Sequence, residues 1–230
     1  MINFITLSIF PQIFESPLNY SIIKRAQDNN LVKFYHYDIR DFTTNKHNRV
    51  DDIIYGGGAG MLMTPQPIFD AIESIKDRFG EVEVIFFTPK GKKLNSEVVQ
   101  EYAYDSNNKN YILLCGRYEG IDNRIREVLV DKEISIGDFI LSGGEIAALI
   151  FIDSVVRYID GALGNKDSLK EESFNENLLE YPQYTRPYDF RGFKVPDILL
   201  SGNHKKIADW RKNKQLEITK ERRKDLLDKS

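Results

Sequence analysis

The first 160 residues alternate between two patterns of apolar side chains. Short runs rich in β-branched and aromatic residues are typical of strands, and apolar side chains every three or four positions are typical of helices. The strand-like runs are residues 4–10, 32–37, 82–88, 111–115 and 134–141. The helix-like segments are residues 12–29, 65–78, 96–104 and 123–130. This alternation predicts an α/β domain with a largely parallel sheet.

A further helix is expected over residues 145–159, where apolar side chains cover nearly every face. Such a helix is buried on more than one side, which at the end of an α/β domain predicts a subunit interface. Asp153 and Arg157 stand four positions apart with the acid first. An ordinary helix ion pair is therefore enough to explain both residues.

The pattern breaks at residues 161–177, which are rich in glycine and charge and predict a flexible linker. Helical stretches follow near residues 203–213 and 217–227. We therefore expect an α/β domain over residues 1–160, the linker, and a small, mainly helical domain over residues 178–230.

Charge is divided unevenly along the chain. Residues 1–182 hold 19 Lys/Arg and 28 Asp/Glu, whereas residues 183–230 hold 13 Lys/Arg and 7 Asp/Glu. A basic tail on an acidic body predicts contact with a polyanion such as RNA. A solvated, lysine-rich helix face accounts for the charge equally well.

Composition excludes several other classes of protein. The chain is 41% hydrophobic and 29% charged, as in globular proteins, and lacks a run of about 18 apolar residues that would cross a membrane. The N-terminal residues lack the basic region of a signal peptide, and the single cysteine, Cys115, forms no internal disulfide. We expect a cytoplasmic protein without a membrane partner. One cysteine and three scattered histidines match no zinc spacing, so no metal site is expected from them.

Glycine-containing loops follow three of the expected strands, at residues 88–91, 115–120 and 136–145. Ligands of open parallel sheets bind at the carboxyl ends of the strands, and glycine lets a ligand approach the backbone. Three such loops in one domain predict a ligand site.

Four glycines occur among residues 56–60. Ordering so many glycines costs much backbone entropy, which a plain connector does not need. Close approach to a large partner, such as an extruded base, explains the loop. A disordered surface loop is the alternative.

Taken in order, these loops and their flanks resemble the bacterial tRNA (guanine-N1)-methyltransferase family. The matching strings are VDDIIYGGGAGMLM, FFTPKGKKL, LLCGRYEGIDNRI, EISIGDFILSGGE, IDSVVRYIDGALG, ESF, YPQYTRP and LLSGNHKKIADWR. They span nearly the whole chain. The resemblance implies transfer of a methyl group from S-adenosylmethionine to N1 of the guanine at position 37 of tRNA, beside the anticodon. It also implies a SPOUT-like fold with a deep trefoil knot, a homodimer and a dependence on Mg²⁺.

The resemblance also carries the family's binding residues onto this chain. The cofactor loops fall on Phe87, Thr88, Pro89, Gly116, Tyr118, Glu119, Gly120, Ser135, Ile136, Gly137, Phe139, Leu141, Gly143 and Gly144. The substrate-binding residues fall on Asp51, Asp52, Gly57, Gly58, Gly60, Arg186, Ser201 and His204. The chain departs from the family where Ala59 and Ala147 replace proline and Phe139 replaces tyrosine.

The family's catalytic pair falls on Arg157 and Glu172, where Glu172 replaces the usual aspartate and Glu171 is its neighbour. N1 of guanine carries a proton at neutral pH, so a carboxylate must remove it and a guanidinium can stabilise the charge that develops on O6. Without the resemblance, Glu172 would be one more solvated acid of the linker.

Two other functions remain open from the sequence. A related knotted enzyme methylates the ribose 2′-hydroxyl and needs no base that reads guanine. A non-catalytic RNA-binding dimer would use the same fold without binding S-adenosylmethionine.

Overall fold

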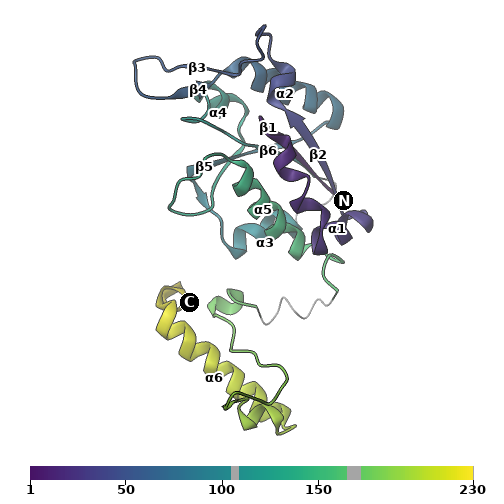
Figure 1. Cartoon of the computed structure of the whole chain (residues 1–230), viewed down its shortest axis with the longest axis vertical. Coiled ribbons are helices and arrows are strands. Elements are labelled where there is room, and N and C mark those ends of the chain that lie inside the picture. Colours follow the sequence, from purple (N-terminus) through teal and green to yellow (C-terminus); the bar gives the residue numbers. More distant parts are fainter. Residues whose placement is uncertain (105–108, 165–171, 230) are drawn as a thin grey trace. The chain divides into compact units, whose positions relative to one another are not determined.

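The structure is a computed structural model that describes residues 1–104, 109–164 and 172–229. The chain divides into two compact units, Met1–Gly164 and Asn165–Ser230 (Figure 1). Within the described ranges, no helix has both the length and the apolar character needed to cross a membrane.

The first unit is built on a five-stranded sheet with the order β2-β1-β6-β5-β7. Every neighbouring pair is parallel, which confirms the predicted parallel sheet. The strands are β1 (Ile2–Ser8), β2 (Val32–Asp38), β5 (Glu83–Lys93), β6 (Asn110–Leu114) and β7 (Lys132–Ser135). Because all strands run the same way, their carboxyl ends meet at one edge of the sheet.

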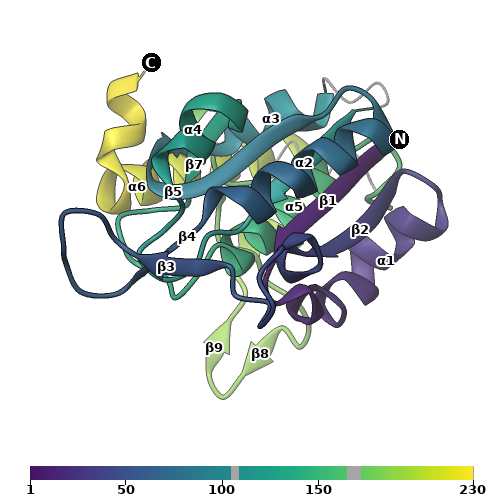
Figure 2. The same cartoon turned by 90° about the horizontal axis from the view of Figure 1, so that it is seen from above.

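Helices cover both faces of this sheet (Figures 1 and 2). One face carries α1 (Ser21–Asp28), α3 (Ser96–Tyr104) and α5 (Glu145–Tyr158), and the other carries α2 (Pro65–Phe79) and α4 (Asn123–Leu129). The alternation along β1 serves both layers: Phe4 packs into the α5 side, whereas Ile5 and Leu7 pack into the α2 side. Each such fully buried side chain contributes about 1.5–3 kcal/mol to folding.

The prediction of one helix over residues 12–29 is wrong. Two 3₁₀ turns, Pro11–Phe14 and Pro17–Asn19, precede the shorter helix α1. Pro17 contributes to the break, because proline lacks a backbone N–H and its ring clashes with the preceding helical turn. The extended backbone of Tyr20 then separates the second turn from α1. Phe14 and Leu18 are still buried, so the four-residue spacing identified core positions without identifying the backbone.

The predicted strand over residues 134–141 is also too long, because β7 ends at Ser135. Gly137 has a φ of +147°, which interrupts the extended run. The following Phe139 and Ile140 are 54% and 80% exposed. This apolar run therefore belongs to a loop and not to the core.

The glycine-rich segment connects two short antiparallel strands, β3 (Asp51–Ile53) and β4 (Met61–Met63). The four glycines near its tip all have positive φ, at 85° to 132°. An L side chain rarely adopts this backbone, which explains the glycines locally.

The second unit contains the long helix α6 (His204–Arg222) and the short hairpin of β8 (Asp189–Phe190) and β9 (Phe193–Lys194). The two helices expected near residues 203–213 and 217–227 are largely one helix, because no proline or glycine separates them. Thr219 is fully buried, and its Oγ1 accepts a hydrogen bond from the backbone N of Leu179 at 2.9 Å. This contact ties the extended segment before the hairpin to α6.

Candidate active site

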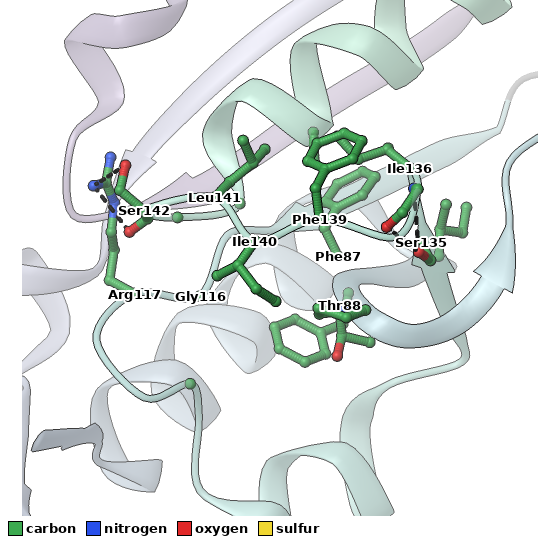
Figure 3. Close-up of a pocket in the computed structure, with 18 of the residues that line it drawn as sticks. Phe87, Thr88, Gly116, Arg117, Ser135, Ile136, Phe139, Ile140, Leu141 and Ser142 are labelled. Atoms are coloured by element: carbon green, nitrogen blue, oxygen red, sulfur yellow. Dashed lines mark hydrogen bonds between the residues drawn. The ribbon is translucent and has the colours of Figure 1, made fainter. Parts of the chain in front are cut away.

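A cleft of about 310 Å³ lies where three bends meet (Figure 3). The first bend lies within β5 (residues 88–91), the second follows β6 (residues 115–120) and the third follows β7 (residues 136–144). Its volume falls within the range of small-molecule sites. All fourteen residues predicted for the cofactor loops line it. Six further lining residues were not predicted: Phe86, Arg117, Ile134, Ile140, Ser142 and Ala147.

The first bend interrupts the pairing of β5 with β7. Their register shifts between Phe87 and Lys92, so that Thr88 and Pro89 are not paired with β7 and border the cleft. A Cβ added at Gly91 would lie 2.5 Å from the backbone carbon of Glu133. Only glycine lets the backbone at residue 91 pass β7 this closely.

The second and third bends lie directly against each other. The backbone N of Gly144 donates to the carbonyl of Gly116 at 3.0 Å, and Arg117 forms a β-bridge with Gly143. A Cβ at Gly144 would lie 2.8 Å from Cα of Cys115. Glycine therefore permits two backbones to meet at the floor of the cleft.

Apolar side chains border the opening of the cleft. Phe139, Ile140 and Leu141 are 54%, 80% and 38% exposed, and Figure 3 shows their side chains along the third bend. At its other end, Ser135 Oγ lies 3.3 Å from the backbone N of Gly137. The site thus combines glycine-containing backbone bends with apolar walls, a lining that suits a flat, polar-edged ring.

The β3–β4 hairpin packs against the second bend. Glu119 N donates to the carbonyl of Met61, and Met63 N donates to the carbonyl of Gly120, both at 3.0 Å. A Cβ at Gly60 would lie 2.6 Å from Cγ of Glu119. The structure therefore places the predicted substrate residue Gly60 beside the predicted cofactor residue Glu119.

The other predicted substrate residues of the first unit lie along the same hairpin. Asp51 and Asp52 belong to β3, and Gly57 and Gly58 lie in its open tip, where an added Cβ would meet nothing within 4 Å. Tyr55, which the sequence reasoning did not single out, is 98% exposed between them.

The predicted catalytic residues belong to different units. Arg157 lies half-buried in the last turn of α5. Glu172 lies half-buried in the second unit, where its carbonyl accepts from Asn175 N at 3.3 Å. Glu171 lies outside the described residues. Arg157 belongs to the first unit and Glu172 to the second, and the structure describes each unit separately. The pairing of these two residues therefore stays a prediction.

A groove of about 820 Å³ runs along α6 in the second unit. Predicted His204 lines it, whereas predicted Arg186 and Ser201 are exposed in nearby loops. The guanidinium of Arg211 lies 4.7 Å from the centre of the Tyr181 ring, and Trp210 also lines the groove. Basic and aromatic side chains together are typical of surfaces that bind single-stranded nucleic acid.

One group beside the cleft is unsuited to nucleophilic chemistry. Cys115 is fully buried, and that burial raises the pKa of its thiol well above the usual range, with the nearby negative charge of Glu145 acting in the same direction. A buried neutral thiol is a poor nucleophile. Among the residues that the structure describes, no group of three His, Cys, Asp or Glu side chains could hold a metal ion.

Fold and cleft together define an α/β protein with a ligand site made of loops at the carboxyl edge of a parallel sheet. A family profile described as tRNA (Guanine-1)-methyltransferase TrmD matches residues 2–229. The chain belongs to this family.

Curated relatives match over almost the full length of the chain. A protein of Clostridioides difficile (strain 630), named tRNA (guanine-N(1)-)-methyltransferase, is 52% identical over 99% of this chain and 98% of its own. Proteins of the same name from Dictyoglomus turgidum and Caldanaerobacter subterraneus subsp. tengcongensis are 50% and 54% identical, covering 100% and 99% of this chain and 91% and 92% of their own.

Proposed function

We propose that this protein transfers the methyl group of S-adenosylmethionine to N1 of the guanine at position 37 of tRNA. The observation that carries the proposal is the family match over residues 2–229. The cleft supports it, because the residues predicted as cofactor loops from three separate segments meet around one space.

The cleft suits S-adenosylmethionine in size and in lining. Its bends offer backbone donors and acceptors for an adenine edge and ribose, and Phe139 and Leu141 offer apolar walls. We assign the fourteen lining residues predicted from the sequence to cofactor binding. When bound, S-adenosylmethionine supplies an electrophilic methyl group.

In the proposed chemistry, Glu172 accepts the N1 proton of guanine and makes N1 nucleophilic. Arg157 stabilises the negative charge that spreads toward O6. Asp51, Asp52 and the glycines of the β3–β4 hairpin hold the base, and Arg186, Ser201 and His204 hold the RNA. Ordering of the segment around Glu172 on tRNA binding would couple recognition to assembly of the site. The family resemblance implies Mg²⁺, to which we assign no residue.

The proposed working form is a homodimer. Helix α5 buries one face in the core, whereas Ile146 and Ile150 on another face are 48% and 41% exposed. Exposed Ile140 and Leu141 of the cleft belong to the segment just before this helix. A second copy of the chain would cover this apolar surface and complete the site.

The remaining parts of the proposal concern domains and topology. Residues 1–160 would form the cofactor-binding domain with a trefoil knot in the bends, residues 161–177 a linker, and residues 178–230 the tRNA-binding domain. The close passage of Gly144 across Cys115 suits a knotted chain. A tRNA substrate favours the cytoplasm as the compartment.

Incubation with a tRNA transcript and labelled S-adenosylmethionine, followed by nucleoside analysis, tests the function. We expect 1-methylguanosine at position 37. A 2′-O-methylated nucleoside would indicate the related ribose methyltransferase. Binding of tRNA without binding of S-adenosylmethionine would indicate a non-catalytic RNA-binding protein.

A further inference from the structure

A carboxylate is buried directly behind the cleft. Glu145, the first residue of α5, is 1% exposed and is not among the residues that line the cleft. Its Oε1 accepts hydrogen bonds from Ser8 Oγ at 2.6 Å and from Arg117 Nε at 3.1 Å. Its Oε2 lies 3.0 Å from Arg117 Nη2.

Arg117 connects two of the three bends. It belongs to the second bend, yet its Nη1 donates to the carbonyl of Ser142 in the third bend at 3.2 Å (Figure 3). Its guanidinium also lies 4.8 Å from the centre of the Phe10 ring, just beyond the end of β1. One side chain thus contacts the third bend, the start of α5 and the segment after β1.

The fit around this ion pair is tight. A Cβ added at Gly143 would lie 2.2 Å from Arg117 Nε and 2.5 Å from Glu145 Oε2. The third bend therefore rests on the ion pair itself. Any side chain at position 143 would therefore displace the Arg117 guanidinium, the Glu145 carboxylate or the backbone of the third bend.

A buried ion pair is weak grounds for stability, because desolvation of both charges offsets much of their attraction. It is strong grounds for fixed geometry, since a guanidinium and a carboxylate share directional, charge-assisted hydrogen bonds. Loops containing glycine would otherwise lose much entropy when a ligand orders them. Fixing them beforehand lowers that cost of binding.

We propose that Ser8, Glu145 and Arg117 form a positioning network that sets the spacing of the second and third bends and so preorganises the cleft for its cofactor. Glu145 and Ser8 act through Arg117. This inference rests on the proposed function, which makes S-adenosylmethionine the ligand of the cleft.

The test is Glu145→Gln in the full-length protein, with the Kd for S-adenosylmethionine and for S-adenosylhomocysteine measured by calorimetry. In this variant the loosened bends would adopt the binding arrangement only part of the time. If they adopt it for about a tenth of the time, both Kd values rise about tenfold. At saturating cofactor, the single-turnover rate should stay within about threefold of the wild-type rate, because the reacting groups are unchanged.

Glu133→Gln is the matched control. Glu133 also forms a two-point pair, with Arg126 at 2.7 Å and 3.0 Å, and its side chain does not line the cleft. We expect this variant to lower the melting temperature without changing either Kd. Equal rises in Kd for both variants would reduce the network to a general contribution to stability and overturn the proposal.

Ser8→Ala removes a single hydrogen bond and serves if Glu145→Gln fails to fold. We expect a smaller rise in Kd, of about two- to fivefold. If Glu145→Gln folds and has wild-type Kd values, the positioning network is overturned but the proposed function is not. If only Ser8→Ala folds, wild-type Kd values in that variant lead to the same conclusion. A wild-type protein that binds no S-adenosylmethionine would overturn the proposed function, and the network's role with it.

Discussion

Asp122 shows how one side chain can serve both a helix and a loop. It caps α4, with Oδ1 accepting from Arg124 N at 2.9 Å, and its own backbone N donates to the carbonyl of Met63 at 3.0 Å. It therefore holds the start of α4 and the end of the β3–β4 hairpin beside the second bend. The helix end explains a short polar residue at this position.

The capping role of Asp122 predicts a pH dependence. Hydrogen bonds from the Arg124 side chain lower the pKa of the Asp122 carboxyl below its usual 3.8. Because the folded pKa is the lower one, its contribution to stability is present above the unfolded pKa and is lost as pH falls through the folded pKa. Asp122→Ala should lower the free energy of unfolding by about 0.5–2 kcal/mol at pH 7.

Urea unfolding of both proteins between pH 3 and 7 measures this difference. The gap between wild type and Asp122→Ala should narrow below about pH 4. Asp122→Asn keeps a capping oxygen and serves as the control, with a smaller loss at pH 7. If the difference in unfolding free energy between wild type and Asp122→Ala is constant from pH 3 to 7, the ionised Asp122 carboxylate does not stabilise the fold as proposed.

The proposed base gives a second prediction at the scale of single residues. Glu172→Gln keeps the size of the side chain and removes its basicity, so the single-turnover rate should fall by roughly 10²–10⁴. Binding of cofactor and tRNA should change little, because the loss appears in the transition state. Glu171→Gln is the neighbouring control and should be mild. An active Glu172→Gln beside an inactive Glu171→Gln would move the role by one residue.

At the scale of elements, the sequence located the cleft through its loops. Glycine is required where two backbones pass closely, as at Gly144, because no side chain fits there. Such a requirement appears in the sequence as the glycine itself. The Arg117–Glu145 pair joins residues 28 positions apart, and no periodic pattern reports such a contact. The available signal was an arginine inside a glycine-containing loop.

The limits of the element predictions have equally specific causes. The spacing of apolar residues predicted α3 with its observed bounds, because the buried side chains of this segment all belong to one uninterrupted helix. The same spacing failed at residues 12–29, where Pro17 breaks the backbone without disturbing burial. The strand prediction failed after Ser135, where exposed Phe139 and Ile140 border the cleft and resemble the continuation of a strand.

The exposed face of α5 gives a prediction about assembly. Ile150 is 41% exposed on the face that we assign to a second copy of the chain. Ile150→Glu would bury a charge in that interface and should yield a monomer with little activity. Light scattering after size exclusion, together with the methylation assay, measures both effects.

Val128→Glu is the control for the assembly prediction. Val128 is 66% exposed on α4, which covers the opposite face of the sheet. Its replacement should change neither mass nor activity. A wild-type monomer at working concentration that methylates tRNA would contradict the proposed dimer.

At the scale of the whole molecule, the proposed binding and catalytic residues are divided between the two units. The cleft belongs to Met1–Gly164, whereas Glu172 and the groove along α6 belong to Asn165–Ser230. Residues 183–230 carry 13 of the 32 Lys/Arg. No sequence pattern links Arg157 to Glu172, because the pairing that we propose would depend on how units and subunits assemble around a substrate. Only the family resemblance supplied it.

This division predicts that the two binding activities separate on truncation. A protein ending at Gly164 keeps the whole sheet, all three bends and the Glu145–Arg117 pair. It should bind S-adenosylmethionine within about threefold of the full-length Kd, because its cleft loses no lining residue. It should bind tRNA at least about tenfold more weakly at physiological salt, since phosphate contacts from the basic segment are lost.

Calorimetry with cofactor and filter binding with a tRNA transcript, each at two salt concentrations, measure the two affinities. Lys205→Ala with Lys206→Ala in the full-length chain is the milder comparison, because both lysines are exposed in the first turn of α6. This double variant should reduce the salt dependence of tRNA binding by about one unit of slope per lysine that contacts phosphate. If the truncated protein binds tRNA as tightly as the full chain, the basic charge of residues 183–230 is a solvated helix face and the RNA contacts lie on the first unit.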